Sequence, residues 1–405
     1  MTSSAIEETP PLKPNMTILE DRWLHHVMVF FSSFDERPTW FNWLVLLGVV
    51  GIYLAVASLV VPVVALSLAV ILFGFMLLDI GLLWILPRVG VSFGAVPAPL
   101  ILLSMPRLAV AGLSLLLAIF QPWSAVWLML ILQIAGLTVY LWSSLIEPYQ
   151  LSLTQLQIQT STLKSDAPPI RMLHLSDLHL ERLTKRENHV LDLIAQAKPD
   201  LIVITGDYLN LSYNRDPEAI DQVRAFLPKI KAPFGVYATL GSPPVDVWDV
   251  APFHFKDTDI RLLRNETVDL DLGQGRQLTL IGMDCTHDMT YDVYQLEKQF
   301  ETPLPQVPRV LLYHSPELMP DACKKDIDLF LCGHTHGGQV RLPFYGAILT
   351  SSCTGKRYEM GRYDEQGTTL YVSRGIGLEG MSAPRIRLFC PPEITLVTLQ
   401  GRAEH

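Results

Sequence analysis

Aspartate and histidine side chains follow short apolar runs at several points in this sequence. Residues 170–175 form such a run and precede Asp177 and His179, and residues 201–204 precede Asp207. Carboxylates and neutral imidazoles are common ligands of Mn, Fe, Zn and Mg in proteins. These residue types therefore indicate a metal site carried by loops at the ends of strands.

Two later apolar runs end in the same way. Residues 309–313 precede His314, and residues 327–331 precede His334 and His336. The carboxyl ends of the strands in an open α/β sheet meet at one edge, where ligands bind. We therefore predict one site for two divalent metal ions, with the ligands Asp177, His179, Asp207, His314, His334 and His336.

The elements that carry these loops alternate between strand and helix. Residues 151–158 alternate between apolar and polar, which predicts a first strand. Residues 185–197 read as a helix between the buried strands at 170–175 and 201–204. This order predicts an α/β fold.

The chain is too apolar for an ordinary soluble enzyme, because 49% of its 405 residues are hydrophobic and only 18% are charged. The excess lies in residues 41–146, whose charged residues are Asp79, Arg88 and Arg107. We predict three parts: a polar N-terminal segment (residues 1–40), a transmembrane helical region (residues 41–146) and a globular domain (residues 147–405).

The transmembrane region is long enough for four helices of about 20 residues each. We place a turn near Val61 and Pro62, a third span over residues 106–121 and a fourth over residues 123–146. Three or five spans are the alternatives. Asp79 has no evident charged partner within the spans, so we expect an interfacial position or a hydrogen bond to a neighbouring helix, with ion transport as the alternative.

Basic residues indicate the side of the membrane on which the globular domain lies. Lys13, Arg22 and Arg37 precede the first predicted span, and Arg88 and Arg107 flank the connection between the second and third. Positive residues accumulate in cytoplasmic loops. With four spans, this distribution predicts a multi-pass protein of the cell membrane with a cytoplasmic C-terminal domain; an odd number of spans reverses the side.

Charge and cysteine usage argue against two other classes of protein. The net charge is −9, and Lys and Arg do not cluster with aromatic residues, so we expect no nucleic-acid partner. The five cysteines have no C-x-x-C spacing, which argues against a structural zinc site or a disulfide framework.

Taken in order, four motifs resemble those of the calcineurin-like metallophosphoesterases, in particular the bacterial membrane-associated branch of YaeI- and YkuE-type phosphodiesterases. The motifs are Ser176-Asp177-Leu178-His179, Gly206-Asp207, His314 and Gly333-His334-Thr335-His336-Gly337-Gly338-Gln339. The resemblance covers about residues 150–400 and implies a four-layer αββα sandwich with a dinuclear metal centre at one edge. It implies that Asp177, His179 and His336 hold the first ion, that His314 and His334 hold the second, and that Asp207 bridges them. The catalytic residues that it implies are Asp207 and His334.

One motif of that family is replaced. The family carries Gly-Asn-His-Asp or Gly-Asn-His-Glu after its third strand, whereas here Gly241-Ser242-Pro243-Pro244 follows residues 234–240. Ser242 is a poorer ligand than asparagine, so we expect a weak second metal site. Pro243 has no proton to donate, and general acid catalysis contributes about 10²- to 10⁴-fold to a rate. The candidate replacements for the lost histidine are His174, which reads as structural, and His254, His287 and Asp246.

The resemblance thus implies a membrane-anchored, metal-dependent phosphoesterase, a hydrolase of phosphoric esters, with impaired or altered catalysis. The alternative is a catalytically inactive metal- or phosphate-binding regulatory membrane protein. The domain begins within a few residues of the last predicted span. We therefore expect its site to lie near the bilayer and its substrate to be a lipid-linked or otherwise membrane-associated phosphoester.

Overall fold

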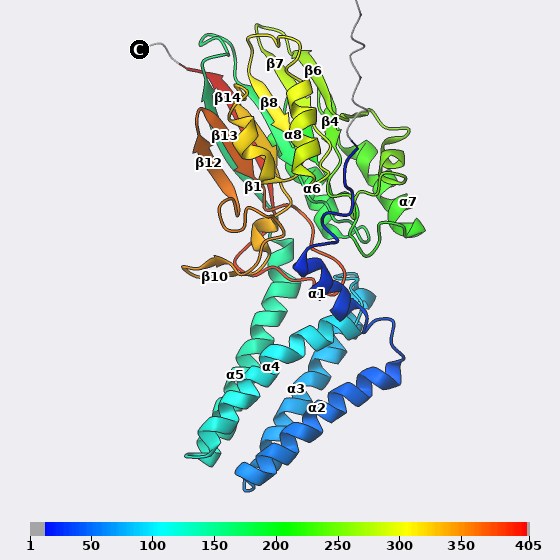
Figure 1. Cartoon of the computed structure of the whole chain (residues 1–405), viewed down its shortest axis with the longest axis vertical. Coiled ribbons are helices and arrows are strands. Elements are labelled where there is room, and N and C mark those ends of the chain that lie inside the picture. The colour runs from blue at the N-terminus through cyan, green and yellow to red at the C-terminus, as the bar shows by residue number, and fades with distance from the viewer. Residues whose placement is uncertain (1–12, 403–405) are drawn as a thin grey trace, which may run out of the picture.

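The computed structural model describes residues 13–402 and shows two regions stacked along the long axis of the molecule (Figure 1). One region is a bundle of long helices, and the other contains β-sheets with flanking helices. Residues 1–12, the start of the segment predicted at residues 1–40, lie outside the described residues.

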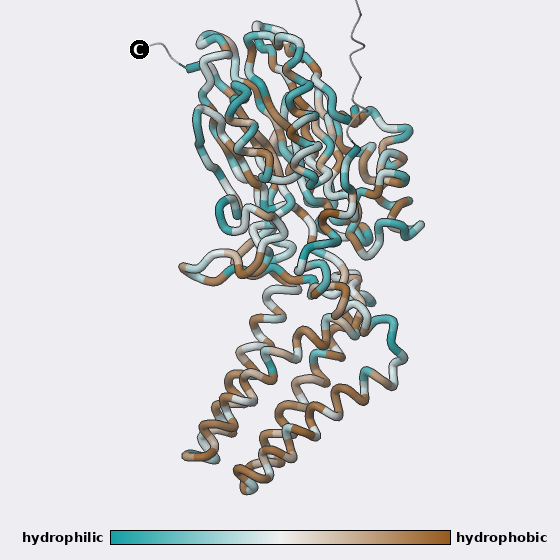
Figure 2. Tube along the Cα trace, viewed as in Figure 1, coloured by the Kyte–Doolittle hydropathy of each residue, from teal (hydrophilic) through white to brown (hydrophobic). Residues whose placement is uncertain are grey.

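Four helices are long and apolar enough to cross a membrane, as predicted. They are α2 (Thr39–Val60), α3 (Ala65–Ile85), α4 (Pro97–Ala118) and α5 (Pro122–Leu141). Apolar residues occur along the whole length of each helix (Figure 2), and many of their side chains face outward. The break between α2 and α3 confirms the predicted turn near Val61.

The third span differs from the prediction. We expected it to start at Pro106, but α4 begins at Pro97 and contains Pro106 in its interior. An internal proline removes one backbone hydrogen bond, and membrane helices tolerate this loss where neighbouring groups compensate. The consequence is that Arg107 lies inside the bundle and not in a connecting loop.

Arg107 is the partner of Asp79. Its Nε and Nη2 donate to the two carboxylate oxygens of Asp79 at 2.9 and 2.8 Å, and its Nη1 donates to the side chain of Gln133 in α5 at 2.9 Å. The expectation that Asp79 has no charged partner within the spans is therefore wrong. The predicted hydrogen bond to a neighbouring helix is confirmed.

A short apolar helix, α1 (Trp23–Ser32), has no counterpart among the predicted elements. It lies at the junction between the bundle and the sheets (Figure 1). Its Met28 carbonyl accepts a hydrogen bond from Ser382 Oγ at 3.1 Å.

The sheet-containing region is built from fourteen described strands. They are β1 (Ser152–Thr160), β2 (Ile170–Leu175), β3 (Leu201–Thr205), β4 (Val236–Thr239), β5 (Ile260–Leu262), β6 (Glu266–Asp271), β7 (Gln277–Gly282), β8 (Arg309–Leu312), β9 (Leu329–Cys332), β10 (Arg341–Leu342), β11 (Gly346–Ala347), β12 (Gly361–Glu365), β13 (Thr368–Val372) and β14 (Glu393–Gly401). One sheet has the order β1-β14-β2-β3-β4-β5, the second has the order β12-β13-β9-β8-β7-β6, and β10 pairs with β11. Strands β2 to β5 run parallel to one another, as do β7, β8, β9 and β13.

The two large sheets and their helices form four layers. Helices α6 (Lys185–Ala197) and α7 (Pro217–Phe226) pack on the outer face of the first sheet. Helices α8 (Met289–Lys298) and α9 (Met319–Ala322) pack on the outer face of the second. Aliphatic side chains of the two inner faces form one shared core. The predicted αββα sandwich is confirmed.

Local sequence explains how these elements position the loops that follow them. Helix α6 begins at a capping box, in which Thr184 N donates to Glu187 Oε2 at 2.7 Å. It buries Val190, Leu193 and Ile194, which share one helix face. Strands β2 and β3 are buried almost throughout, as expected for parallel strands covered on both faces.

The carboxyl ends of the parallel strands face the helical bundle. Glu181, two residues after His179, accepts a hydrogen bond from Phe93 N in the connection between α3 and α4 at 3.2 Å. Its other carboxylate oxygen accepts from Arg385 Nε at 2.7 Å. The loops with the predicted ligands therefore lie at the end of the sheets nearest the bundle.

Candidate metal centre

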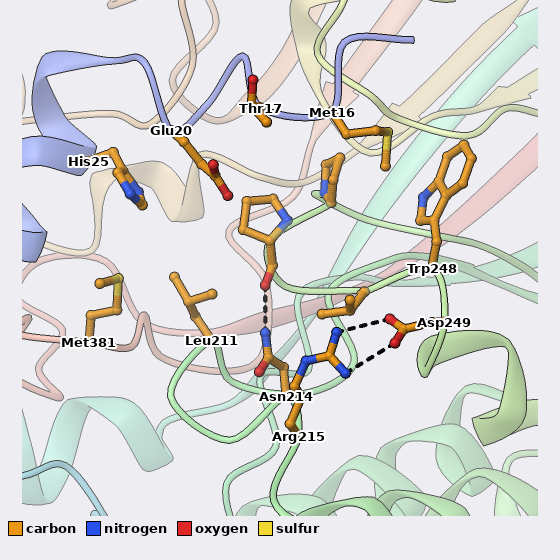
Figure 3. Close-up of a pocket in the computed structure, with 13 residues that line it drawn as sticks. Met16, Thr17, Glu20, His25, Leu211, Asn214, Arg215, Trp248, Asp249 and Met381 are labelled. Carbon is orange, nitrogen blue, oxygen red and sulfur yellow. Dashed lines mark hydrogen bonds and ion pairs between the residues drawn. The ribbon is translucent and has the colours of Figure 1, made fainter. Parts of the chain in front are cut away.

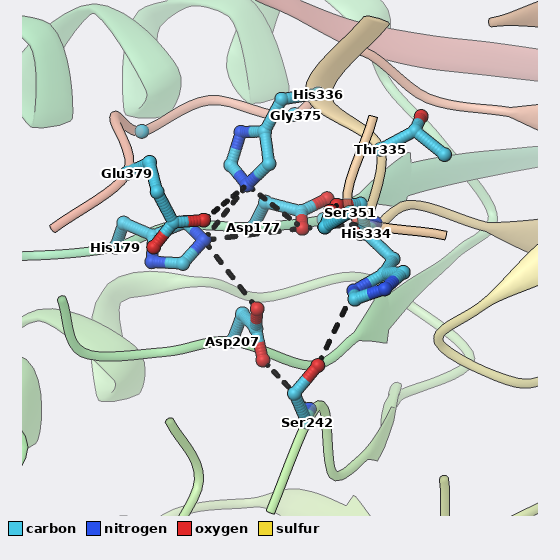
Figure 4. A network of polar contacts seen from close by, with 12 residues as sticks. Asp177, His179, Asp207, Ser242, His334, Thr335, His336, Ser351, Gly375 and Glu379 are labelled. Carbon is cyan, nitrogen blue, oxygen red and sulfur yellow. Dashed lines mark hydrogen bonds and ion pairs between the residues drawn. The ribbon is translucent and has the colours of Figure 1, made fainter. Parts of the chain in front are cut away.

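The structure brings all six predicted ligand side chains together at the carboxyl ends of four strands, and every one of them is buried. Figure 4 shows Asp177, His179, Asp207, His334 and His336 around one point. Strand β2 leads to two of them, β3 to one, β8 to one and β9 to two. In chain order they are Asp177, His179, Asp207, His314, His334 and His336.

Two aspartates link the histidines. Asp207 Oδ2 lies 3.4 Å from His179 Nε2 and 3.2 Å from His314 Nε2. Asp177 Oδ1 lies 3.4 Å from His336 Nε2. The ligand atoms of Asp177, His179 and His336 all lie within 4.8 Å of one another, as do those of Asp177, Asp207 and His314. These two groups share Asp177, and Asp207 Oδ2 lies beside a histidine of each, so together they could hold two neighbouring cations.

Polar atoms in this cluster lack hydrogen-bond partners. Asp177 Oδ2, His334 Nε2 and His336 Nδ1 are buried without one, although an unsatisfied buried polar atom costs about 1–3 kcal/mol. In addition, His179 Nε2 and His336 Nε2 face each other at 2.9 Å. Two imidazole lone pairs repel each other at this distance unless a proton or a cation lies between them. This donor set fits a metal site.

The pKa shifts fit the same interpretation. Burial, followed by the charge of His287, lowers the pKa of His334 well below its ordinary value, and burial with His179 does the same for His336. Both imidazoles are therefore neutral, the form that binds metal. Burial alone would lower the pKa of His314, but the Asp207 carboxylate outweighs it and raises that pKa to about 10. A divalent cation could replace the proton that Asp207 holds on His314.

Most of the predicted ligands have an unusual backbone conformation. The φ angle is positive at Asp177 (51°), His179 (40°), Asp207 (58°), His334 (69°) and His336 (50°). Non-glycine residues adopt this region rarely, and such residues gather at functional sites. The loops are thus shaped to direct side chains to one point at a cost in backbone energy.

Two glycines permit the loops to approach one another. A Cβ atom at Gly333 would lie 2.0 Å from Asp177 Oδ2, and one at Gly241 would lie 2.1 Å from Asp207 Oδ1. Any larger residue at either position would displace a carboxylate of the cluster.

The replaced motif still reaches the centre. Ser242 N donates to Asp207 Oδ1 at 2.8 Å, so the loop after β4 contacts the cluster through its backbone. Ser242 Oγ lies 3.3 Å from His334 Nδ1 and 3.1 Å from His287 Nε2. Pro243 follows directly and offers no polar side-chain atom.

Among the candidate replacements, His287 has a ring nitrogen in contact with the Ser242 side chain. It follows β7, a strand absent from the predicted elements, and its φ of 61° matches those of the predicted ligands. Its Nδ1 lies 3.0 Å from Glu317 Oε2. The ligand atoms of His287, Glu317 and His334 all lie within 4.8 Å of one another.

Sequence reasoning missed Glu317 and did not place His287. The signal for His287 was available, because the apolar run at residues 278–281 precedes it as other strands precede their ligands. Glu317 follows His314 by three residues in the loop after β8, and only the fold shows that its carboxylate faces His287 in the loop after β7.

The other candidate replacements make different contacts. His174 Nε2 pairs with Thr205 Oγ1 at 2.8 Å inside the first sheet, and His254 lies in a short helical turn, Ala251–Phe255. Asp246 accepts hydrogen bonds from Asp207 N and Gly241 N at 2.8 and 2.7 Å. Burial, together with the Asp207 charge, raises the pKa of Asp246 to about 7. Asp246 therefore holds the loops after β3 and β4 together through their backbone N–H groups.

A pocket of about 640 Å³ adjoins the loop after β4 (Figure 3). Apolar side chains from distant parts of the chain line much of it, including Met16, Leu211, Pro243, Trp248 and Met381. Pro243, which lines the pocket, directly follows Ser242 in the sequence.

Comparisons with known proteins agree with this geometry. The family model described as calcineurin-like phosphoesterase matches residues 170–338, a range that contains all six predicted ligands. The chain is 30% identical to the uncharacterized metallophosphoesterase YkuE of Bacillus subtilis, over 65% of this chain and 90% of YkuE. It is 30% identical to the phosphodiesterase YaeI of Escherichia coli, over 58% of this chain and 84% of YaeI. It is 24% identical to the UDP-2,3-diacylglucosamine pyrophosphatase LpxG of Chlamydia muridarum, over 65% of this chain and 93% of LpxG.

Proposed function

Because this chain belongs to the calcineurin-like phosphoesterase family, we propose that it is a membrane-anchored, metal-dependent hydrolase of phosphoric esters. The observation that carries the proposal is the position of Asp207 Oδ2, within 3.4 Å of His179 Nε2 and 3.2 Å of His314 Nε2. One carboxylate at that position can bridge two cations.

In this proposal Asp177, His179 and His336 hold one ion, Asp207 bridges, and His314 and His334 belong to the second. Divalent cations held by these residues would neutralise phosphoryl oxygens and lower the pKa of the attacking water. Mn, Fe, Zn and Mg all accept these donors. The buried carboxylates and imidazoles would hold the ions, and the surrounding loops would keep bulk water out.

His287 brings an imidazole from the loop after β7 to the side chain of Ser242, which stands where the family has its asparagine ligand. Its Nε2 faces Ser242 Oγ, while Glu317 accepts at Nδ1 and so fixes the orientation of the ring. Glu317 is itself held, because its Oε1 accepts from Cys353 N at 2.8 Å and lies 3.4 Å from Arg22 Nη2. We propose that His287 Nε2 is a ligand of the second ion, in the role that Ser242 fills poorly.

A lipid-linked phosphoester is the proposed substrate. The pocket beside Pro243 is largely apolar, and the loops of the centre contact the connection between α3 and α4. An apolar part of a substrate could occupy this pocket while its phosphoryl group reaches the cluster. The name of the relative LpxG describes action on a diacylated nucleotide sugar, which is consistent with this choice.

The domain is proposed to lie in the cytoplasm. Arg22, Arg37 and Arg88 flank the bundle at its domain end, whereas the connections at the far end, residues 61–64 and 119–121, carry no charge. An excess of positive residues at one end of a helical bundle is typical of its cytoplasmic end. Protease digestion of the C-terminal domain in intact cells, without permeabilisation, would contradict this orientation.

Metal analysis and hydrolysis of bis-nitrophenyl phosphate by the purified full-length protein test the proposed activity. We expect bound divalent metal together with turnover that a chelator abolishes and the added metal restores. Pro243 cannot protonate a leaving group, so esters with poor leaving groups should suffer most. We expect the protein to hydrolyse nitrophenyl esters faster than alkyl phosphates by a ratio about 10²-fold larger than the ratio of the uncatalysed reactions. A ratio of the two rates equal to that of the uncatalysed reactions would contradict this account of the replaced motif.

The second candidate function is a metal- or phosphate-binding regulatory module without turnover, which Pro243 in place of a proton donor favours. It predicts bound metal and no hydrolysis of either ester. In that case Ser242→Asn with Pro243→His should create activity, because the other predicted ligands are in place.

A further inference from the structure

A small β-hairpin presents large apolar side chains to the outside of the protein. Strands β10 and β11 pair antiparallel, and Pro343, Phe344 and Tyr345 form the turn between them. Phe344 is fully exposed, and Tyr345 is 59% exposed. An aromatic side chain that is exposed to water at the tip of a hairpin contributes no packing energy. This exposure therefore indicates a surface that another molecule covers.

The apolar surface extends beyond the hairpin. Phe389 is 60% exposed and lies beside it, because Arg341 N donates to the carbonyl of the preceding residue, Leu388, at 2.9 Å. Ile348 and Leu349, which follow β11, are exposed as well. We call the exposed residues Leu342, Phe344, Tyr345, Ile348, Leu349 and Phe389 the hairpin patch.

The hairpin patch is continuous with the end of the membrane-spanning bundle. Arg387 N, two residues before Phe389, donates to the carbonyl of Ser143 at 2.8 Å, in the helical turn that prolongs α5. In the same turn Trp142 and Ile146 are each 44% exposed. Figure 1 shows the hairpin projecting sideways at the level where α5 meets the sheets.

We propose that the hairpin patch inserts into the interfacial layer of the bilayer that the four helices span. Two observations favour lipid over a protein partner: the aromatic composition of the tip and its level at the end of α5. Aromatic rings gather at the interface between hydrocarbon and water. Lys356 Nζ lies 3.8 Å from the centre of the Tyr345 ring and donates to the carbonyls of Tyr345 and Ala347, so it holds the hairpin in this position.

This docking fixes the distance between the metal cluster and the membrane surface. The hairpin begins five residues after His336, and Arg341 Nη1 donates to the carbonyl of Gly337 at 2.9 Å. The loop that carries His336 is thus tied to the inserted element. The metal cluster is held at the lipid surface from two sides, by α5 and by the hairpin.

Lipid-borne quenchers test the proposal in the full-length protein reconstituted into bilayers. A polarity-sensitive fluorophore would be attached to Phe344→Cys, in a Cys353→Ser background that removes the exposed native thiol. We expect blue-shifted emission and quenching by nitroxide-labelled lipids about three-fold stronger than at a control site. The control is Gln274→Cys, an exposed turn residue between β6 and β7 at the opposite ends of the parallel strands.

A second label keeps the test independent of any one variant. With the fluorophore on Phe389→Cys, lipid quenching should again exceed that at position 274, and adding Phe344→Asp should reduce it. Quenching at positions 344 and 389 by aqueous iodide to the same extent as at position 274, with no quenching from lipid, would overturn the proposal. Protection from both quenchers would also overturn it, since a protein partner or a second copy would then cover the patch.

Discussion

The bundle and the sheet-containing region each bury a cluster of charged side chains, but they differ in how completely the polar atoms are paired. In the bundle, Arg107 donates to both oxygens of Asp79 and to Gln133, and Gln133 Nε2 donates back to the carbonyl of Arg107 at 3.1 Å. In the sheet-containing region, buried atoms of Asp177 and of His334 have no partner.

The difference separates a structural cluster from a binding site. A fully paired set of charges satisfies itself and holds α3, α4 and α5 together, as intramembrane ionisable groups do when they pair with one another. A set with unpaired ligand atoms, held in strained backbone, is satisfied only by something that binds. The paired cluster argues against ion transport through Asp79, and the unpaired one supports metal binding.

The largest predicted effect comes from removing the bridging charge. Asp207→Asn keeps the shape of the side chain and an acceptor for Ser242 N, but we expect it to lower phosphoesterase activity by at least about 10³-fold. Metal content should fall with it. The matched control is Asp259→Asn, because the Asp259 side chain is 95% exposed and its substitution should change neither quantity. Full metal content in Asp207→Asn would place the ions elsewhere.

Substitutions at the charged pair in the bundle should change the stability of the protein and not its phosphoesterase activity. Arg107→Ala leaves Asp79 buried without its partner, which costs about 3–5 kcal/mol of folding free energy for a buried pair. Asp79→Leu with Arg107→Met removes both charges and should recover most of that loss. Thermal unfolding in detergent and hydrolysis per folded molecule measure the two effects. If the stable double variant lost specific activity although its fold was restored, the charged cluster of the bundle and the metal cluster would be coupled.

His287→Ala should have an intermediate effect, confined to the second metal. We expect activity and affinity for the second ion to fall by about 10- to 100-fold, the usual range for such supporting groups. Adding Ser242→Asn should restore the second ion by supplying an amide oxygen. His254→Ala provides the control of a buried histidine outside the three ligand groups. An unchanged second ion in His287→Ala would sink this assignment and leave the proposed activity standing.

Metal removal, which should abolish turnover, should have a smaller effect on stability than the loss of Arg107. A ligand present at 100 times its dissociation constant stabilises a fold by about 2.7 kcal/mol. A chelator should therefore lower the melting temperature of the sheet-containing region by about 5–10 °C, and added Mn should restore it. No change in melting temperature would indicate that the cluster binds no ion in the folded protein.

Much of the fold could be predicted because its signals are local. The apolar stretches gave four helices, and β2 and α6 have the predicted bounds, since buried strands and capped amphipathic helices leave patterns in short windows. Helix α4 was misplaced because a proline inside a membrane helix resembles a helix start. The pairing of Asp79 with Arg107 depends on how three helices pack, which periodicity does not encode.

The candidate site also has a part that local sequence predicts and a part that depends on packing. The six predicted ligands each follow a strand, so strand order alone suggested that they meet. Glu317 could not be found, because its relation to His287 depends on the contact between the loops after β7 and β8. His287 could have been found, had the strand at β7 been recognised.

The most direct test of the central claim is electron paramagnetic resonance of the full-length protein loaded with Mn, together with elemental analysis. The account predicts two ions per chain and the multiline signal of a coupled pair about 3.5–4 Å apart. It also predicts that Asp207→Asn abolishes this coupling. An isolated-ion spectrum at full loading, or no bound metal, would contradict the account.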